Sequence, residues 1–118
     1  MAIAYQEGSA LISTTEYSLP SAGTYSPASP QTGAGIVQAF IDFNAMAAGD
    51  EFRIRIYEKA RAADTQRLMY EGRLEGAQSQ PLWSAPAQML SRGWDVTVQK
   101  ITGTDRTITW SVRRMPDA

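Results

Sequence analysis

The sequence alternates apolar and polar residues over several short stretches, and this period of two is typical of a half-buried β-strand. Residues 35–44 read GIVQAFIDFN, and one face of such a strand collects four apolar side chains: Val37, Ala39, Ile41 and Phe43. Residues 51–59 read EFRIRIYEK, in which Phe52, Ile54 and Ile56 point one way and the arginines between them the other. No segment longer than about eight residues has a convincing helical period. We therefore expect an all-β protein.

Residues 66–76, QRLMYEGRLEG, are the natural hairpin partner of residues 51–59. We expect Leu68, Tyr70 and Leu74 to face inward. One register places Arg55 opposite Glu71, where opposite charges contribute a few tenths to about 1 kcal/mol. Another register places Arg55 opposite Arg73, and the sequence leaves that choice open.

Two later stretches carry their apolar residues at even positions. These positions are Trp94, Val96 and Val98 in the first stretch, and Ile108, Trp110 and Val112 in the second. Because a slip of one residue would turn one stripe into solvent, a hairpin between them needs an odd-numbered loop or a bulge. We predict a hairpin centred on Gly103 with two opposing pairs: Val98 with Ile108, and Val96 with Trp110. Both tryptophans would then lie in the core.

The remaining segments are predicted to lie at the margins of the fold. Pro81 and Pro86 cannot donate to a ladder, so residues 77–93 are expected to form an edge segment that crosses between sheets. Its apolar contacts would be Leu82, Trp83, Met89 and Leu90. Residues 9–19 should form a strand with a weak stripe at odd positions: Leu11, Ser13, Thr15, Tyr17 and Leu19. About seven or eight short strands favour an antiparallel, jelly-roll-like β-sandwich, with a small barrel as the alternative.

Residues 17–35, YSLPSAGTYSPASPQTGAG, carry no charge and contain Pro20, Pro27 and Pro30. Such a segment is a slack linker, an ordered loop, or an arm that lies on another molecule. Long connections without structure are uncommon inside a domain, and proline lowers the entropy cost of ordering an arm. We interpret it as an assembly arm or an interface loop. Residues 1–34 then form a strand with this arm or loop, and residues 35–118 form the sandwich core of a single domain.

The composition excludes most chemistry. The 118 residues include no histidine and no cysteine, so a Ser-His-Asp triad, a cysteine nucleophile and ordinary zinc sites are ruled out. The net charge of −1 gives no general attraction to nucleic acid, and no apolar run approaches the roughly 20 residues of a membrane span. We expect no cleaved secretion signal, no enzyme activity and no cofactor. All eleven basic residues lie between Arg53 and Arg114, which leaves residues 1–50 with four acids and no base.

Three groups of side chains are candidate sites. Glu58 and Glu71 could supply the two carboxylates that glycoside hydrolysis requires. Nearby basic residues account for them equally well, as members of surface ion pairs. A basic face with Tyr57 among its arginines could bind single-stranded nucleic acid, or it could be a salt-bridged sheet face or a contact for an acidic partner. Its arginines are Arg53, Arg55, Arg67 and Arg73. The aromatic residues Tyr17, Tyr25, Phe40 and Trp83 suit a sugar platform, a protein interface or the protein's own core. A calcium loop drawn from Asp42, Asn44, Asp50, Glu51 and Asp64 lacks the required spacing.

Four stretches together resemble small all-β virion proteins encoded among the head and tail structural genes of tailed bacteriophages. They are STTEYSL (13–19), FRIRIYEK (52–59), TQRLMYEG (65–72) and GWDVTVQKITGTDRTITWSVRR (93–114). They cover about half of the chain, and none of them is a catalytic motif. The resemblance implies a structural role in the virion, such as a capsid cement or decoration protein that is assembled in the host cytoplasm. Its implied partners are the major capsid protein and further copies of itself, with a trimer as one arrangement.

We therefore expect a non-enzymatic protein that stabilises a capsid shell, with neither nucleic acid nor membrane as a partner. A tail or neck protein is one alternative, and a carbohydrate-binding module with Trp83, Tyr25 and Tyr57 as its platform is another. The residues predicted to form the interface are Tyr17, Pro20, Tyr25, Pro27, Pro30, Phe40, Arg53, Arg55 and Trp83.

Overall fold

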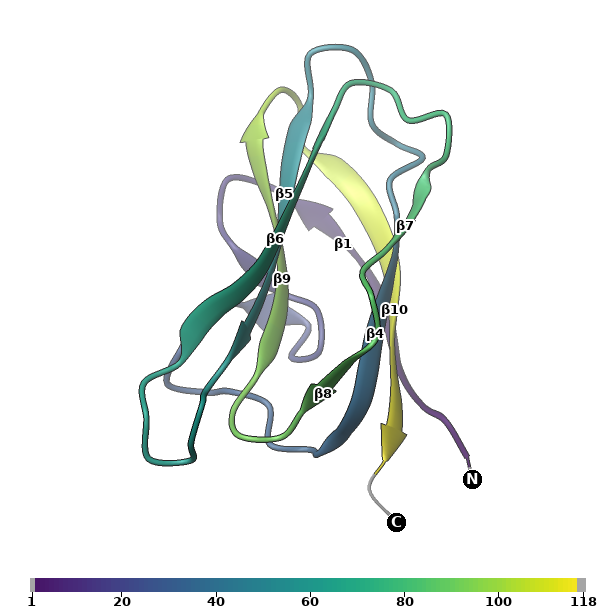
Figure 1. Ribbon diagram of the computed structural model, residues 1–118. Helices are drawn as coiled ribbons and strands as arrows, with labels where there is room; N and C mark the ends of the chain where they lie inside the picture. Colours follow the sequence, from purple (N-terminus) through teal and green to yellow (C-terminus); the bar gives the residue numbers. More distant parts are fainter. Residues whose placement is uncertain (1, 117–118) are drawn as a thin grey trace.

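The computed structural model describes residues 2–116, which form ten strands in two antiparallel sheets (Figure 1). We call the first sheet A; it contains, in spatial order, β1 (Ala4–Ile12), β10 (Arg106–Pro116) and β4 (Gly35–Asp42), with β7 (Leu82–Ser84) and β8 (Gln88–Leu90) both along the far side of β4. Sheet B contains, in order, β3 (Gly23–Thr24), β2 (Tyr17–Ser18), β9 (Asp95–Thr102), β5 (Glu51–Glu58) and β6 (Arg67–Glu75). This confirms the all-β prediction. Within residues 2–116 there is no helix, and hence none long and apolar enough to cross a membrane.

The core lies between the two sheets. The predicted stripes of β4 and β5 are confirmed, because Val37, Ala39, Ile41, Phe43, Phe52, Ile54 and Ile56 are all buried. Full burial of each large apolar side chain contributes roughly 1.5–3 kcal/mol relative to exposure. Alternation is thus sufficient to tell which side chains of β4 and β5 face the other sheet.

The hairpin predicted around Gly103 is wrong. β9 pairs with β2 and β5 in sheet B, whereas β10 pairs with β1 and β4 in sheet A. Trp94, Val96, Val98, Ile108, Trp110 and Val112 are nevertheless all buried, as expected. The two stripes meet across the core from opposite sheets instead of lying side by side. An odd-numbered loop is required only when both strands lie in one sheet, and the loop at Gly103 crosses between two sheets.

The hairpin of β5 and β6 is confirmed, with Arg55 opposite Glu71. The Nε atom of Arg55 lies 2.7 Å from Oε1 of Glu71. Tyr70 and Leu74 pack against the core as expected, but the inward position predicted for Leu68 is wrong, because its side chain is largely exposed. A β-bulge between Ile56 and Tyr57 shifts the register at that end of the hairpin.

The stripe predicted for residues 9–19 is wrong in its first part. β1 pairs with β10 along its whole length, and its even positions face inward, so Ile12 is buried and Leu11 is exposed. The chain then crosses to sheet B, where Tyr17 and Leu19 turn inward. The crossing at residues 13–16 ends the strand and resets the alternation.

The edge segment predicted for residues 77–93 is confirmed where β7 and β8 pair with β4. Trp83 and Leu90 pack inward, but the inward contacts predicted for Leu82 and Met89 are wrong. Those two side chains are 63% and 82% exposed. They are the neighbours in sequence of inward-facing residues, so strand alternation turns them outward.

The charge-free segment after Tyr17 lies against its own sheet. The backbone of Leu19 donates to the carbonyl of Val96, and Gln31 and Trp94 exchange two backbone hydrogen bonds. The indole Nε1 of Trp94 also donates to the carbonyl of Gly33 at 2.9 Å. Of the three forms considered for this segment, an ordered internal loop describes these contacts.

Candidate interaction surfaces

The residues predicted to form the interface lie on four different parts of the molecule. Arg53 and Arg55 project from the outer face of sheet B, where Tyr25 covers Tyr57. Phe40 lies on the outer face of sheet A. Tyr17 and Trp83 pack against the core, and Tyr17 meets the ring of Trp110 edge-on at 5.5 Å. The three prolines belong to the internal loop, where Pro27 is exposed and Pro20 and Pro30 are half-buried. These residues therefore do not form one patch.

The outer face of sheet B holds a closed polar network. Glu16 accepts hydrogen bonds from the hydroxyls of Tyr57 at 2.5 Å and Thr97 at 2.6 Å. The Tyr25 ring stacks on Tyr57 at 4.7 Å between centroids, and its hydroxyl donates to Gln66. Burial, reinforced by Tyr57, raises the pKa of Tyr25 to about 12. One face of each tyrosine ring is therefore occupied within the protein.

This arrangement does not build the sugar platform considered for Trp83, Tyr25 and Tyr57. Trp83 lies on β7 of the other sheet, where its ring packs beside Tyr70 and over Gly72. On sheet B, Tyr57 is buried beneath Tyr25, so these two rings do not offer two free faces side by side to a ligand ring.

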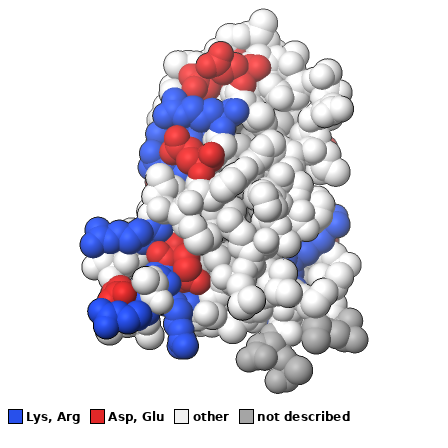
Figure 2. Space-filling view, viewed as in Figure 1, with Lys and Arg blue, Asp and Glu red and all other residues white. Residues whose placement is uncertain are grey.

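Three of the four arginines proposed for the basic face, Arg53, Arg55 and Arg73, contact neighbouring side chains. Arg55 pairs with Glu71, whose pKa is lowered mainly by the hydrogen bond from Arg55. Arg73 pairs with Glu51 and Glu71, and Arg53 donates to the amide oxygen of Gln99. Around these three arginines the face is a salt-bridged surface, which differs from the run of unpaired cations that binds a polyanion. Figure 2 shows these alternating charges on the side of the molecule formed by β5 and β6.

The candidate carboxylate pair does not converge. Glu58 lies opposite Arg67 in the hairpin, and its carboxylate accepts from the backbone amides of Ser91 and Arg92. Glu71 lies opposite Arg55 and is engaged by that guanidinium. Both carboxylates therefore have structural partners. Residues 2–116 also contain no group of three or more acidic side chains arranged to hold a metal ion.

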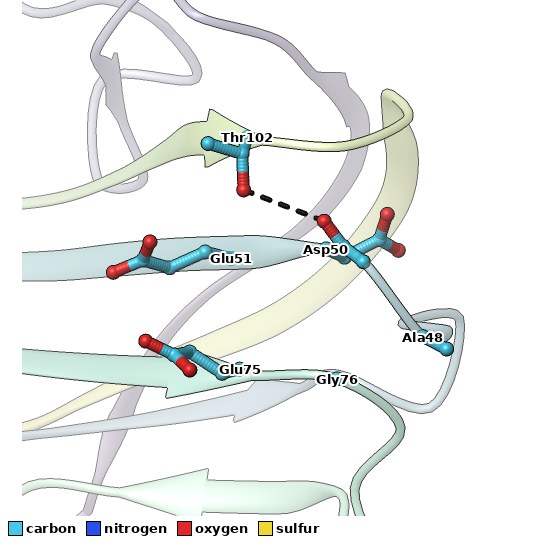
Figure 3. A pocket seen from close by; sticks show the side chains of 7 residues that line it. Ala48, Asp50, Glu51, Glu75, Gly76 and Thr102 are labelled. Carbon is cyan, nitrogen blue, oxygen red and sulfur yellow. Dashed lines mark hydrogen bonds between the residues drawn. The ribbon is translucent and has the colours of Figure 1, made fainter.

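A hollow beside the start of β5 is lined in part by Asp50, whose carboxylate has a structural role (Figure 3). Its lining residues are Ala48, Gly49, Asp50, Glu51, Glu75, Gly76 and Thr102. The Asp50 carboxylate points away from Glu51 and Glu75 and accepts from Arg106 Nε at 2.7 Å. It also accepts from the backbone amides of Ala47 and Thr104. These hydrogen bonds, led by that of Arg106, lower the pKa of Asp50 to about 2. Asp50 thus connects the loop before β5 to the loop that joins β9 to β10.

The outer face of sheet A is different, because large apolar side chains are exposed there. We call this set the apolar face: Ile3, Tyr5, Ile36, Phe40, Met89 and Met115. The pairing explains the cluster, since Met115 lies opposite Ile36 and Ile36 lies opposite Met89. A shallow groove of about 250 Å³ runs between Ile3, Ile36, Phe40 and Met115. The guanidinium of Arg113 covers one side of the Phe40 ring, 3.9 Å from its centroid.

Few charges interrupt this face. At outward positions of β1, β4 and β10, the charged residues are Glu7, Asp42 and Arg113. In Figure 2 the surface over β4, β7 and β8 is mostly uncharged, in contrast to the β5–β6 side. Sequence reasoning identified Phe40 here and missed the others. The available signal was the second face of each alternating strand, which carries Ile36 beside Phe40 and Ile3 beside Tyr5.

By its fold and surfaces, the protein is an all-β protein in which one outer sheet face is salt-bridged and the other is apolar and poor in charge. In comparisons with known proteins, no family model and no curated protein matches this sequence.

Proposed function

We propose that this chain is a non-enzymatic structural protein of a tailed-phage virion, most specifically a capsid decoration protein that binds and stabilises the shell of major capsid protein. The observation that carries the proposal is the apolar face on sheet A. The phage setting comes from the sequence resemblance. The finer fold class, a jelly-roll-like β-sandwich, belongs to the same proposal.

The apolar face has the composition of a protein interface. Interface cores are depleted in charged residues and enriched in aromatic residues and methionine. Met89 and Tyr5 are 82% and 57% exposed, and Ile36 and Met115 lie between them on adjoining strands. Exposed apolar side chains that are contiguous mark a contact site more reliably than scattered ones. A groove lined by such side chains suits an apolar ridge on a protein shell.

The salt-bridged face of sheet B indicates how the protein would be oriented on the capsid shell. Its ion pairs and stacked tyrosines satisfy their own polar groups, so this face can remain against water. Sheet A would then contact the shell while sheet B faces outward. The loop that contains Pro20, Pro27 and Pro30 lies with sheet B, and an exposed residue such as Pro27 could contact a neighbouring molecule.

The test measures both copy number and the contact itself. Quantitative mass spectrometry of purified particles whose genome encodes this chain should give on the order of hundreds of copies per particle. Particles assembled without the chain should bind added protein, and Met89→Asp should lower that binding roughly tenfold. Met69→Asp is the matched control, since Met69 is an exposed methionine on sheet B.

A count of about six or twelve copies would replace this proposal with a neck or tail ring. Equal binding by Met89→Asp and the wild type would remove the apolar face as the contact.

A further inference from the structure

The two sheets have four outer edges, and three of them are protected. β3 has two residues, and β7 and β8 have three each beside Pro81 and Pro86, so these edges are too short to pair widely. β6 is nine residues long, but it carries Arg67, Glu71, Arg73 and Glu75 and faces a bulge in β5. Short strands, charges and bulges are the devices that keep sheet edges from pairing with other chains.

The fourth edge, β1, is neither short nor bulged, and it carries a single charge. It is also nine residues long, AYQEGSALI, with Glu7 as its one charged residue and no proline. Its pairing with β10 runs without a bulge from Ala4 to Ile12. Alternate backbone amides and carbonyls along an edge strand have no partner within their own sheet. β1 is therefore a long edge without a bulge, and it is open to another strand.

We propose that β1 pairs antiparallel with β1 of a second copy of this chain, about a two-fold axis at Gly8. This inference does not rest on the virion role. It assigns a two-fold contact, where the sequence resemblance had suggested a trimer among the possible assemblies.

The register follows from strand geometry and charge. Outward residues meet outward residues only if paired positions have the same parity, since alternate side chains point to opposite faces. A centre at Glu7 would place two carboxylates opposite each other. A centre at Gly8 overlaps the full strands, because Ala4 then lies opposite Ile12 of the second copy. It places Glu7 opposite Ser9 and avoids repulsion.

The same register accounts for two exposed side chains on β1. Tyr5 and Leu11 are 57% and 63% exposed. With Gly8 at the centre, Tyr5 of each copy lies opposite Leu11 of the other, and the two-fold axis makes this aromatic–aliphatic pair occur twice. Such cross-strand pairs are a main source of sheet stability. The two five-stranded A sheets become one continuous sheet, and their apolar faces lie together on the same side.

A charge test reads out the register in purified protein. Sedimentation equilibrium should show a reversible dimer for the wild type. Ser9→Glu should raise the dimer Kd roughly tenfold, because each new carboxylate faces Glu7 of the other copy. Ser9→Lys should lower the Kd several-fold by forming two ion pairs. Met69→Glu, on the protected β6 side, should leave the Kd unchanged.

A crosslinking test uses the absence of native cysteine. Tyr5→Cys and Leu11→Cys chains, mixed and oxidised mildly, should form a disulfide-linked heterodimer. Either variant alone should not, because the two equivalent positions then lie about 20 Å apart. Each variant carries a single cysteine, so no bridge can form within one chain.

A chain that remains monomeric up to about 1 mM would overturn the inference and leave the edge for a different partner. A dimer whose Kd ignores both Ser9 variants, or equal crosslinking by one variant alone, would overturn the register. Loss of particle binding with an intact dimer would contradict the proposed function and leave this pairing standing.

Discussion

The indole ring of Trp110 on β10 lies directly against the backbone of Gly8 on β1. The two residues are cross-strand partners, and a Cβ atom at residue 8 would lie 2.6 Å from Cζ2 of Trp110. Glycine at this position lets the large ring cover the edge strand and complete the core. An aromatic side chain packed over an edge glycine is a recognised way to stabilise such a strand.

We expect Gly8→Ala to lower the free energy of unfolding by about 1–3 kcal/mol, the usual cost of overpacking a well-filled site. The new methyl group forces either the Trp110 ring or β1 to move. Chemical denaturation followed by tryptophan fluorescence measures the change. Ser9→Ala, one residue along on the exposed face, is the control and should stay within about 0.5 kcal/mol of the wild type. A Gly8→Ala protein as stable as that control would show that Trp110 has room to shift.

Asp50 should make the protein sensitive to strong acid. Its pKa of about 2 in the folded protein lies below the ordinary aspartate value of 3.8, so its stabilising contribution is present above about pH 4. That contribution is lost as the pH falls from about 4 to about 2. The melting temperature measured against pH should therefore decline in this range, and Asp50→Asn should flatten this part of the curve. Thr104→Ala should behave as the wild type, since the Thr104 backbone amide is the group that donates to Asp50.

Asp95 should make the folded protein less stable as the pH rises, which is opposite to the effect of Asp50. Burial raises the pKa of Asp95 to about 6, although Ser18 and the Val96 amide donate to its Oδ1 atom. Between about pH 4 and 6 the unfolded chain loses this proton first, so stability should fall by on the order of 2 kcal/mol as the pH rises. Asp95→Asn should abolish that fall in unfolding titrations across the range. Ser18→Ala removes a hydrogen bond that favours the ionised form, and it should extend the fall to higher pH.

Tyr25 should hold the proline-containing loop onto sheet B. Tyr25→Ala removes both the stack on Tyr57 and the hydrogen bond to Gln66, at an expected cost of about 1–3 kcal/mol. Limited proteolysis with a protease of broad specificity, mapped by mass spectrometry, should then cut faster within residues 20–30. Tyr25→Phe keeps the stack and should give an intermediate rate. Pro27→Ala, at an exposed position, should be cut no faster than the wild type because it leaves the stack intact. Unchanged cleavage of Tyr25→Ala would mean that the Gln31–Trp94 bridge alone holds the loop.

The sequence was sufficient to predict most of what is local to a strand. Alternation identified the buried faces of β4, β5, β9 and β10, because a period of two follows from backbone geometry in any sheet. The hairpin of β5 and β6 was also predictable, since its strands are close in sequence. Arg55 opposite Glu71 was one of two registers considered, and the structure selects it.

Only the tertiary structure decided which sheet each strand joins and which outer sheet face exposes apolar side chains. Residues 93–100 and 106–114 bury their stripes equally well beside each other or across a core, so alternation could not exclude the wrong hairpin. The apolar face arises because β4, β8, β10 and the chain before β1, far apart in sequence, bring Ile36, Met89, Met115 and Ile3 together. Alternation says that such side chains point outward, but their assembly into one surface depends on long-range pairing, which no local pattern encodes.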